Sequence, residues 1–422
     1  MFETIKNKIY KTLRWSEKYA KTDMVYLVGQ SGWLFFGQIS IFLLTLLTTW
    51  VFANFLEKAN YGEYKFVLSI VALASLTTLT GMSSAIARSV AKGEQVSLKR
   101  VFIGKLSYGS LGFLFLLAAS LYYWLNENLL LSTLFLIASI WIPFMEPLGD
   151  YQYILQGKKD FRRQTVYRVL QRAALTFGIL LAILLTKNVV IIVSIYLLAI
   201  TFTNYFAFRR TMHTYPVPHD KTHEFKLMFN YGRKLSVMNI FLVAANHVDK
   251  ILLFYFVGAA QLAVYFFAIS LPQEIQGVLG NVNSVAFPKL VQTSTSSFRL
   301  ALLKKVALYI LLLIVPVTLY VLAAPYIFLL IFPAYVDAVF FSQLFAWTIL
   351  FTPFSLFSHY FLAQEKKKPL YISSFILPTL FILTLLILLP KYGIIGVILS
   401  VYIRLSLDAV VVLYFFLTEK EN

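Results

Sequence analysis

Basic residues in this chain are concentrated in every second gap between twelve apolar blocks. Of the 37 Lys and Arg residues, 31 fall in the odd-numbered places counted from the N-terminus and four in the even-numbered gaps, and only Lys250 and Arg404 are expected within helices. In membrane proteins, cytoplasmic loops collect Lys and Arg whereas translocated loops lose them. The pattern predicts a multi-pass, all-α integral membrane protein with both termini in the cytoplasm, placed in the inner (cytoplasmic) membrane.

Composition narrows the class of protein further. The chain is 59% hydrophobic and 13% charged, whereas soluble domains are about 25% charged. The net charge of +18 sits in loops beside the membrane, where it favours anionic lipid, so we expect no binding to nucleic acid. Cysteine is absent, which excludes disulfides and thiolate chemistry.

The apolar blocks predict about twelve transmembrane helices in two halves of six. The helices are expected within 25–56, 66–87, 106–125, 129–149, 173–186, 188–208, 235–257, 262–288, 306–332, 338–363, 370–389 and 393–417. The N-terminal half then covers 25–208, a cytoplasmic linker 209–234, the C-terminal half 235–417 and a cytoplasmic tail 418–422. Segment 1–24 combines basic residues with one apolar helix face, which predicts an interfacial amphipathic helix.

The two halves resemble each other when one is shifted by 201 residues. The shift places Gln38 on Asn239 and Arg88 on Lys289, and it predicts a parallel repeat of the kind that binds cargo between its halves. Gln38, Asn239 and Asn246 are therefore candidate substrate-binding residues. Arg88 and Lys289 are candidates for a cytoplasmic gate that meets an anionic head group; the alternative is that both only anchor their helices at the membrane surface.

Known catalytic motifs are missing. The sequence has no phosphate-binding Gly-x-x-x-x-Gly-Lys-Ser/Thr run, and its expected external carboxylates form no pair with acid–base spacing. We therefore predict a protein that is not an enzyme and has no catalytic residues, no cofactor and no metal. His219 and His223 have a spacing that could bind a metal, but we interpret them as part of a solvated linker.

Charged residues inside membrane helices are costly and often functional. Lys250 is predicted to attract an anionic group, with Asp249 and Glu274 tuning its charge; the alternative is a structural network of these three residues. Arg404 and Asp408 are four residues apart, so they can neutralise each other on one helix face.

Two further carboxylates share this spacing. Glu146 and Asp150 lie close in sequence to a basic loop, and we expect them to face water and that loop. The alternative is that they coordinate a cation.

Three passages resemble bacterial polysaccharide flippases of the Wzx type, in the multidrug/oligosaccharidyl-lipid/polysaccharide exporter superfamily. They are residues 52–66, residues 249–253 together with 263–270, and the loop 156–161. Residues 25–56 hold no Lys or Arg, in contrast to the related lipid II flippases.

The resemblance implies that the chain flips a polyprenyl-diphosphate-linked oligosaccharide from the inner to the outer leaflet by alternating access. Lys250 and Arg404 would meet the diphosphate, the lipid tail would stay in membrane lipid, and a polysaccharide polymerase and assembly proteins would be partners. Alternatives are a cation-coupled multidrug exporter that uses Asp249, Glu274 or Asp408, and a membrane glycosyltransferase or polymerase.

Overall fold

The computed structural model describes residues 24–216, 222–291, 296–363 and 366–418. The predicted interfacial segment and C-terminal tail lie outside these ranges, except for their boundary residues. The first helices are α2 (Met24–Phe55), α3 (Lys58–Ala74), η1 (Ser75–Thr78), α4 (Met82–Ala91), α5 (Leu98–Leu125), α6 (Leu129–Gly149), α7 (Tyr151–Gly157), α8 (Phe161–Leu185) and α9 (Val189–Thr214). The later ones are α10 (Thr222–Val257), α11 (Ala259–Val291), α12 (Ser296–Ile331), η2 (Pro333–Ala338), α13 (Val339–Ala346), η3 (Trp347–Phe354), α14 (Ser355–Ala363), α15 (Lys367–Tyr371), the π-helical turn η4 (Ile372–Ile376), α16 (Leu377–Tyr392) and α17 (Ile394–Thr418).

The described part of the chain is built of helices and contains no strand. Eleven of its spans are long and apolar enough to cross a membrane, and a twelfth is formed if Lys58–Thr78 and Met82–Ala91, which are bent by 53° at their break, count as one. Large apolar side chains cover the outside: Phe202 is 73% exposed and Leu330 is 84% exposed. Lipid rather than water suits such a surface, and the prediction of an all-α membrane protein with about twelve spans is confirmed.

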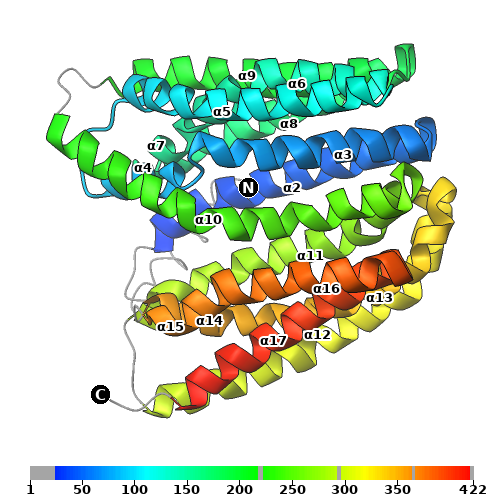
Figure 1. The fold of residues 1–422 in the computed structure, drawn as a ribbon. Helices are drawn as coiled ribbons and strands as arrows, with labels where there is room; N and C mark the ends of the chain where they lie inside the picture. Colours follow the sequence, from blue (N-terminus) through cyan, green and yellow to red (C-terminus); the bar gives the residue numbers. More distant parts are fainter. Residues whose placement is uncertain (1–23, 217–221, 292–295, 364–365, 419–422) are drawn as a thin grey trace, which may run out of the picture.

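The long helices run roughly side by side between two ends of the bundle (Figure 1). One end holds the short connections after α2, α10 and α12, namely Leu56–Glu57, Gly258 and Phe332; we call it the hairpin end. The opposite end holds α4, α7, α15 and the end of α17, and we call it the basic end. Most of the predicted linker 209–234 is helical, because α9 continues to Thr214 and α10 begins at Thr222.

Several helices begin earlier than the hydropathy pattern predicts, among them α3, α5, α8, α10 and α12. Helix α3 begins at Lys58, and α5 and α8 begin at Leu98 and Phe161. The side chains of Ser97 and Asp160 accept hydrogen bonds from backbone N–H groups in the first turns of α5 and α8, and such caps allow a helix to begin among charged residues. The prediction that only Lys250 and Arg404 lie within helices is therefore wrong. Lys65, Lys105 and Arg172 were predicted in gaps but lie within helices.

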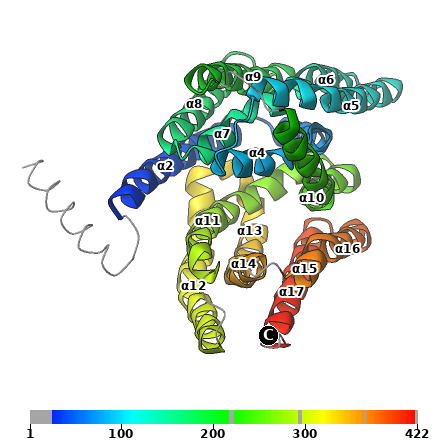
Figure 2. The ribbon, with the colours of Figure 1, turned by 90° about the vertical axis from the view of Figure 1, so that its left-hand side faces the viewer.

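Contacts between α3, α10 and α11 join the N-terminal and C-terminal helices. Helix α3 packs along α11, while α10 packs against α3 and α4 as well as α16. Gly62 makes the α3–α11 contact close, because a Cβ atom there would collide with the backbone carbonyl of Ala259. Seen from the basic end, α11, α12 and α14 stand on one side and α15, α16 and α17 on the other (Figure 2).

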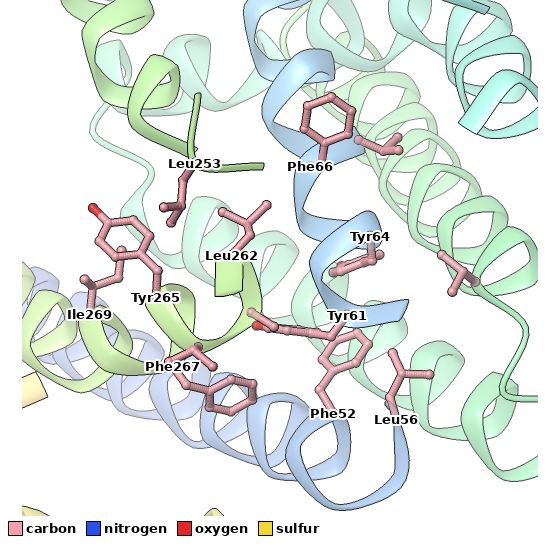
Figure 3. Packing of buried hydrophobic residues seen from close by; sticks show 14 of the residues in the cluster. Phe52, Leu56, Tyr61, Tyr64, Phe66, Leu253, Leu262, Tyr265, Phe267 and Ile269 are labelled. Atoms are coloured by element: carbon pink, nitrogen blue, oxygen red, sulfur yellow. The ribbon is translucent and has the colours of Figure 1, made fainter. Parts of the chain in front are cut away.

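Aromatic side chains fill the interior near the hairpin end (Figure 3). The ring of Phe66 stacks on Phe254 with centroids 3.8 Å apart, and Phe267 stacks on Tyr335 at 3.8 Å and meets Tyr61 at 5.0 Å. Outside these rings, Lys58 Nζ lies 2.7 Å from Asp337 Oδ2. In this conformation, side chains from α3, α10, α11 and η2 therefore pack tightly together at the hairpin end.

Candidate functional site

Four basic side chains from four helices form an interior basic cluster: Lys65 (α3), Arg172 (α8), Lys250 (α10) and Arg404 (α17). Lys65 experiences the charges of both Arg172 and Lys250. Arg404 experiences the charge of Asp249, the neighbour of Lys250. Basic side chains that are far apart in the sequence therefore lie close enough in the fold to act on one another or on a shared neighbour.

Lys65 lies among aromatic rings. Its Nζ atom is 4.7 Å from the centroid of Phe266, 5.3 Å from that of Tyr61 and 5.9 Å from that of Tyr64. Lys250 approaches the same Phe266 ring, at 6.0 Å. Ring faces attract a cation but carry no full negative charge, so they hold Lys65 in place without neutralising it.

Arg172 faces a group of tyrosines. Its charge acts on Tyr61, Tyr64 and Tyr196, and the rings of Tyr64 and Tyr196 lie edge to face with centroids 6.0 Å apart. The guanidinium Nε atom is buried and has no hydrogen-bond partner in the part of the chain that the structure describes. An unused buried donor next to phenol groups suits an oxygen-rich ligand.

The cluster divides into paired and unpaired cations. Within the described ranges, no carboxylate lies within ion-pair distance of Lys65 or Arg172. Lys250 Nζ, by contrast, lies 2.9 Å from Asp249 Oδ1 and also donates to the carbonyl of Asn246 at 2.7 Å. Asp249 is buried and accepts a second hydrogen bond, from the Tyr265 hydroxyl at 2.9 Å. Among the described residues, the cations of the cluster without an ion-pair partner are thus Lys65 on α3, Arg172 on α8 and Arg404 on α17; Arg404 also experiences the charges of Asp408 and Asp249.

The predicted partners of Lys250 and Arg404 are only partly found. Lys250 pairs with Asp249, but no ion pair among the described residues joins it to Glu274. No ion pair within the described ranges joins Arg404 to Asp408, although Arg404 experiences the charge of Asp408. Asp408 accepts a hydrogen bond from Ser373 at 2.6 Å, and the Arg404 guanidinium lies 5.4 Å from the Phe381 ring centroid. Ser373 belongs to the π-helical turn η4, a type of distortion often found at functional sites.

The predicted polar candidates lie at different places. Asn246 is exposed on α10 and contributes its carbonyl to Lys250, while Asn239 is half-buried two turns earlier. Gln38 is half-buried on α2, which packs against α8. No hydrogen bond within the described ranges links Gln38 or Asn239 to the basic cluster, so their role in binding stays a prediction.

Arg88 lies away from this cluster, at the basic end. It is exposed on α4, and its guanidinium stands 5.0 Å from the ring centroid of Tyr231 on α10. The Lys289 side chain and the proposed metal-binding pair His219 and His223 fall outside the described side chains. The gate proposed for Arg88 and Lys289 remains a prediction.

The expectation for Asp150 is wrong. Its side chain is 3% exposed and does not face water, because Lys105 Nζ lies 2.9 Å from Oδ2 and donates to Oδ1 at 3.1 Å. Glu146 is half-buried one turn earlier and experiences the charges of Lys105 and Asp150. The hydropathy pattern places Lys105 in a loop, so no sequence pattern predicts it as the partner of Asp150.

Sequence reasoning also missed Lys65 and Arg172 as interior residues. A signal for Lys65 existed in the repeat, since the 201-residue shift places it on Phe266, the ring that it contacts. Residues equivalent in a two-fold repeat face each other when they lie near its axis. For Arg172, a signal was its place one residue before the predicted helix at 173–186.

Comparisons with known proteins agree with this architecture. A family model described as "Polysaccharide biosynthesis protein" matches residues 27–294. No curated protein sequence matches the chain.

Several solved structures share the fold at low sequence identity. One is a lipid II flippase, MurJ, in an inward closed conformation, with a TM-score of 0.69, 16% identity, and coverage of 93% of this chain and 88% of that one. An inward-facing multidrug resistance MATE family transporter of the MOP superfamily has a TM-score of 0.63, 14% identity and coverage of 89% and 93%. An outward-facing structure of a multidrug resistance MATE family transporter has a TM-score of 0.56 and 16% identity, and the match covers 90% of this chain and 92% of that one.

Proposed function

Because the chain belongs to the polysaccharide biosynthesis protein family, we propose that it flips a polyprenyl-diphosphate-linked oligosaccharide from the cytoplasmic to the outer leaflet. The MurJ structure, a lipid II flippase, supports a lipid-linked cargo for this fold. The observation in this molecule that carries the proposal is the pair of interior cations, Lys65 and Arg172, that lack a carboxylate partner within the described ranges. Nothing in the proposed cycle requires a covalent step, so the protein acts as a transporter rather than an enzyme.

The diphosphate of the carrier lipid would bind at Lys65 and Arg172. An arginine fork matches the oxygen geometry of phosphate, and two cations in a region of low dielectric favour a ligand with more than one negative charge. Tyr61, Tyr64 and Tyr196 could then hydrogen-bond or stack against the first sugar. Lys250 is a secondary contact in this proposal, since Asp249 already neutralises it, and Arg404 lies further toward α16 and α17.

Transport would proceed by alternating access of the two helix groups, 25–208 and 235–417. The tight packing at the hairpin end supports a state that is closed there, and the next state would separate Gly62 from Ala259 and Lys58 from Asp337. The excess of Lys and Arg in gaps at the basic end favours placing that end, with both termini, in the cytoplasm, and the membrane is then the inner one.

A multidrug exporter is the second candidate, because the MATE family structures share the fold. A cation-coupled exporter would need a free intramembrane carboxylate. Asp249 is already bound to Lys250 and Tyr265, and Asp408 to Ser373. Glu274 on α11, however, has no ion pair among the described residues, so the preference for the flippase rests on the family and on the interior cations rather than on the absence of a free carboxylate.

Deletion of the gene tests the proposal. We expect diphosphate-linked glycan to accumulate on the cytoplasmic face of the membrane, and the wild-type gene to restore its export. Normal surface glycan together with greater sensitivity to toxic dyes would contradict the flippase and favour the drug exporter. Complementation of the deletion strain with Lys65→Gln tests the proposed diphosphate site separately from the flippase function. If the wild-type gene restores export and the variant restores it equally, the proposed site is wrong, whereas the flippase function is still supported.

A further inference from the structure

A second group of buried charges lies within the N-terminal helices, apart from the interior basic cluster. It consists of Lys105 on α5, Glu146 on α6 and Asp150 at the junction of α6 and α7. The side chains of Lys105 and Asp150 are 1% and 3% exposed. Glu146 lies one helical turn before Asp150, so both carboxylates act on the same lysine.

The group holds one more negative charge than positive charge when all three residues are ionised. Two carboxylates that share one buried site cannot both ionise without a large cost, and interacting groups of this kind bind a proton as a unit. Asp150 supplies a second observation: its Oδ2 atom is buried and receives no hydrogen bond of directed geometry, although Lys105 Nζ is 2.9 Å away. One proton bound to Glu146 or Asp150 would make the group neutral.

The surrounding helices offer no second cation in direct contact with the carboxylates. From α9, Tyr196 faces Glu146, and Arg172 on α8 faces the same tyrosine. From α7, Tyr151 is next to Asp150 and faces Arg168 on α8.

The remaining packed elements do not change this balance. Lys65 on α3 is directed at the Phe266 ring and Arg88 on α4 at Tyr231. The 3-10 turn η1, Ser75–Thr78, contains only Ser, Leu and Thr residues. Lys105 is thus the one described side chain that pairs with the two carboxylates.

Glu146 and Asp150 lie where the regular hydrogen bonding of α6 is interrupted. Pro143 and Pro147 interrupt the backbone hydrogen bonds of this helix, and the break before α7 falls at Asp150. Asn204 on α9 donates to the carbonyl of Met145 at 3.1 Å, and Gln171 on α8 donates to Asn204 at 2.6 Å. A chain of hydrogen bonds therefore connects the α6 backbone beside Glu146 to the residue next to Arg172.

We propose that Glu146 and Asp150 together bind one exchangeable proton beside Lys105. Gain or loss of this proton shifts α6, and this shift couples the proton gradient to opening of the hairpin end. When the proton is lost, both carboxylates are charged; they attract Lys105 and repel each other. Helix α6 can respond to these forces by bending, because its prolines weaken its backbone hydrogen bonds. The proton site stands on the described contacts alone. Only its use to drive flipping rests on the proposed function.

Infrared difference spectroscopy on the full-length chain in lipid nanodiscs tests the proton site without any substrate. The wild type should show the carbonyl stretch of a protonated carboxyl that changes with pH, and Glu146→Gln or Asp150→Asn should remove it. Glu127→Gln, at an exposed position in the α5–α6 turn, is the matched control and should keep it. The same band in wild type and in both variants would overturn the proposal. Glu146→Gln is the milder change, since Glu146 is only half-buried.

Coupling to the hairpin end is tested by cross-linking. The chain has no natural cysteine, so Lys58→Cys with Asp337→Cys reports closure there through a bifunctional thiol reagent. We expect a yield that changes with pH in the otherwise wild-type chain and does not change when Glu146→Gln is added. An unchanged pH dependence in that variant would overturn the coupling. Because neither readout requires cargo, failure of the flippase proposal in the deletion strain would leave both measurements interpretable.

Discussion

Lys65 Nζ lies 4.7 Å from the ring centroid of Phe266, and the two residues are 201 positions apart in the sequence. This is the shift at which the two halves of the sequence resemble each other. The contact joins α3 to α11 and brings a cation without a carboxylate partner in the described structure to the place where the two helix groups meet.

Substitution of the unpaired cations should weaken binding of the diphosphate. A hydrogen bond to a charged group contributes about 1.5–3 kcal/mol, so Lys65→Gln and Arg172→Gln should each reduce affinity for a short polyprenyl diphosphate by about 10- to 100-fold. Calorimetry on the purified chain measures this effect. Lys92→Gln, at an exposed position of the basic end, is the control. Equal affinities in all three variants would remove both residues from the site.

Lys250 should matter less for binding than Lys65, although it was the first candidate from the sequence. Asp249 already neutralises it, so Lys250→Ala should impair glycan export by a smaller factor than Lys65→Gln at equal protein level. Asp249→Ala should reduce the yield of folded protein more than Lys250→Ala, because it removes the partner of both Lys250 and the buried Tyr265 hydroxyl. Export assays and membrane yields of the three variants decide the order, and a larger export defect for Lys250→Ala would contradict it.

A methyl group at Gly62 should prevent closure of the hairpin end. The Cβ atom of Gly62→Ala would meet the Ala259 carbonyl, a backbone atom that cannot turn away. We expect a loss of cross-linking between Lys58→Cys and Asp337→Cys and a loss of export. Gly277→Ala on α11 is the control, because nothing lies within 4 Å of its added atom. Normal cross-linking in Gly62→Ala would show that α3 and α11 do not need this close approach.

Orientation can be measured with single cysteines in the naturally cysteine-free chain. Glu127 and Lys159 are exposed at the hairpin end and the basic end. A membrane-impermeant thiol reagent should label Glu127→Cys in intact cells and leave Lys159→Cys unlabelled. Glu63 falls in the gap between the first two predicted helices, 25–56 and 66–87, but it is a poor reporter because it lies within α3 with a buried carboxylate oxygen. The opposite labelling pattern would invert the topology.

The Lys105–Asp150 pair should be more sensitive to loss of one partner than of both. Breaking a buried ion pair costs about 3–5 kcal/mol, whereas apolar replacement of both members is often neutral. Lys105→Met should therefore lower the thermal stability of the purified chain more than Lys105→Met combined with Asp150→Leu. Thermal unfolding of the detergent-solubilised variants checks this order. A double variant less stable than either single one would show that the pair stabilises the fold.

The sequence by itself determined the fold class and the approximate position of the spans. Apolar blocks long enough to cross a bilayer can satisfy their backbone hydrogen bonds only as helices or closed barrels, and their length here selects helices. The spacing of basic residues added a testable orientation. The repeat register also places Lys65 on Phe266, but only the structure shows that the two side chains meet.

Only the tertiary structure decided which charges meet inside the bundle. Hydropathy treats a charge as the end of a helix, so Lys65, Lys105 and Arg172 were counted as loop residues. A charge can instead stay within a helix when other helices supply a ring, a carboxylate or a ligand for it. Asp150 neutralises Lys105 and Asp249 neutralises Lys250, whereas no described carboxylate lies within ion-pair distance of Lys65 or Arg172. Lys250 pairs with its own neighbour in the sequence, but Lys105 and Asp150 are 45 positions apart, and no local pattern encodes their contact.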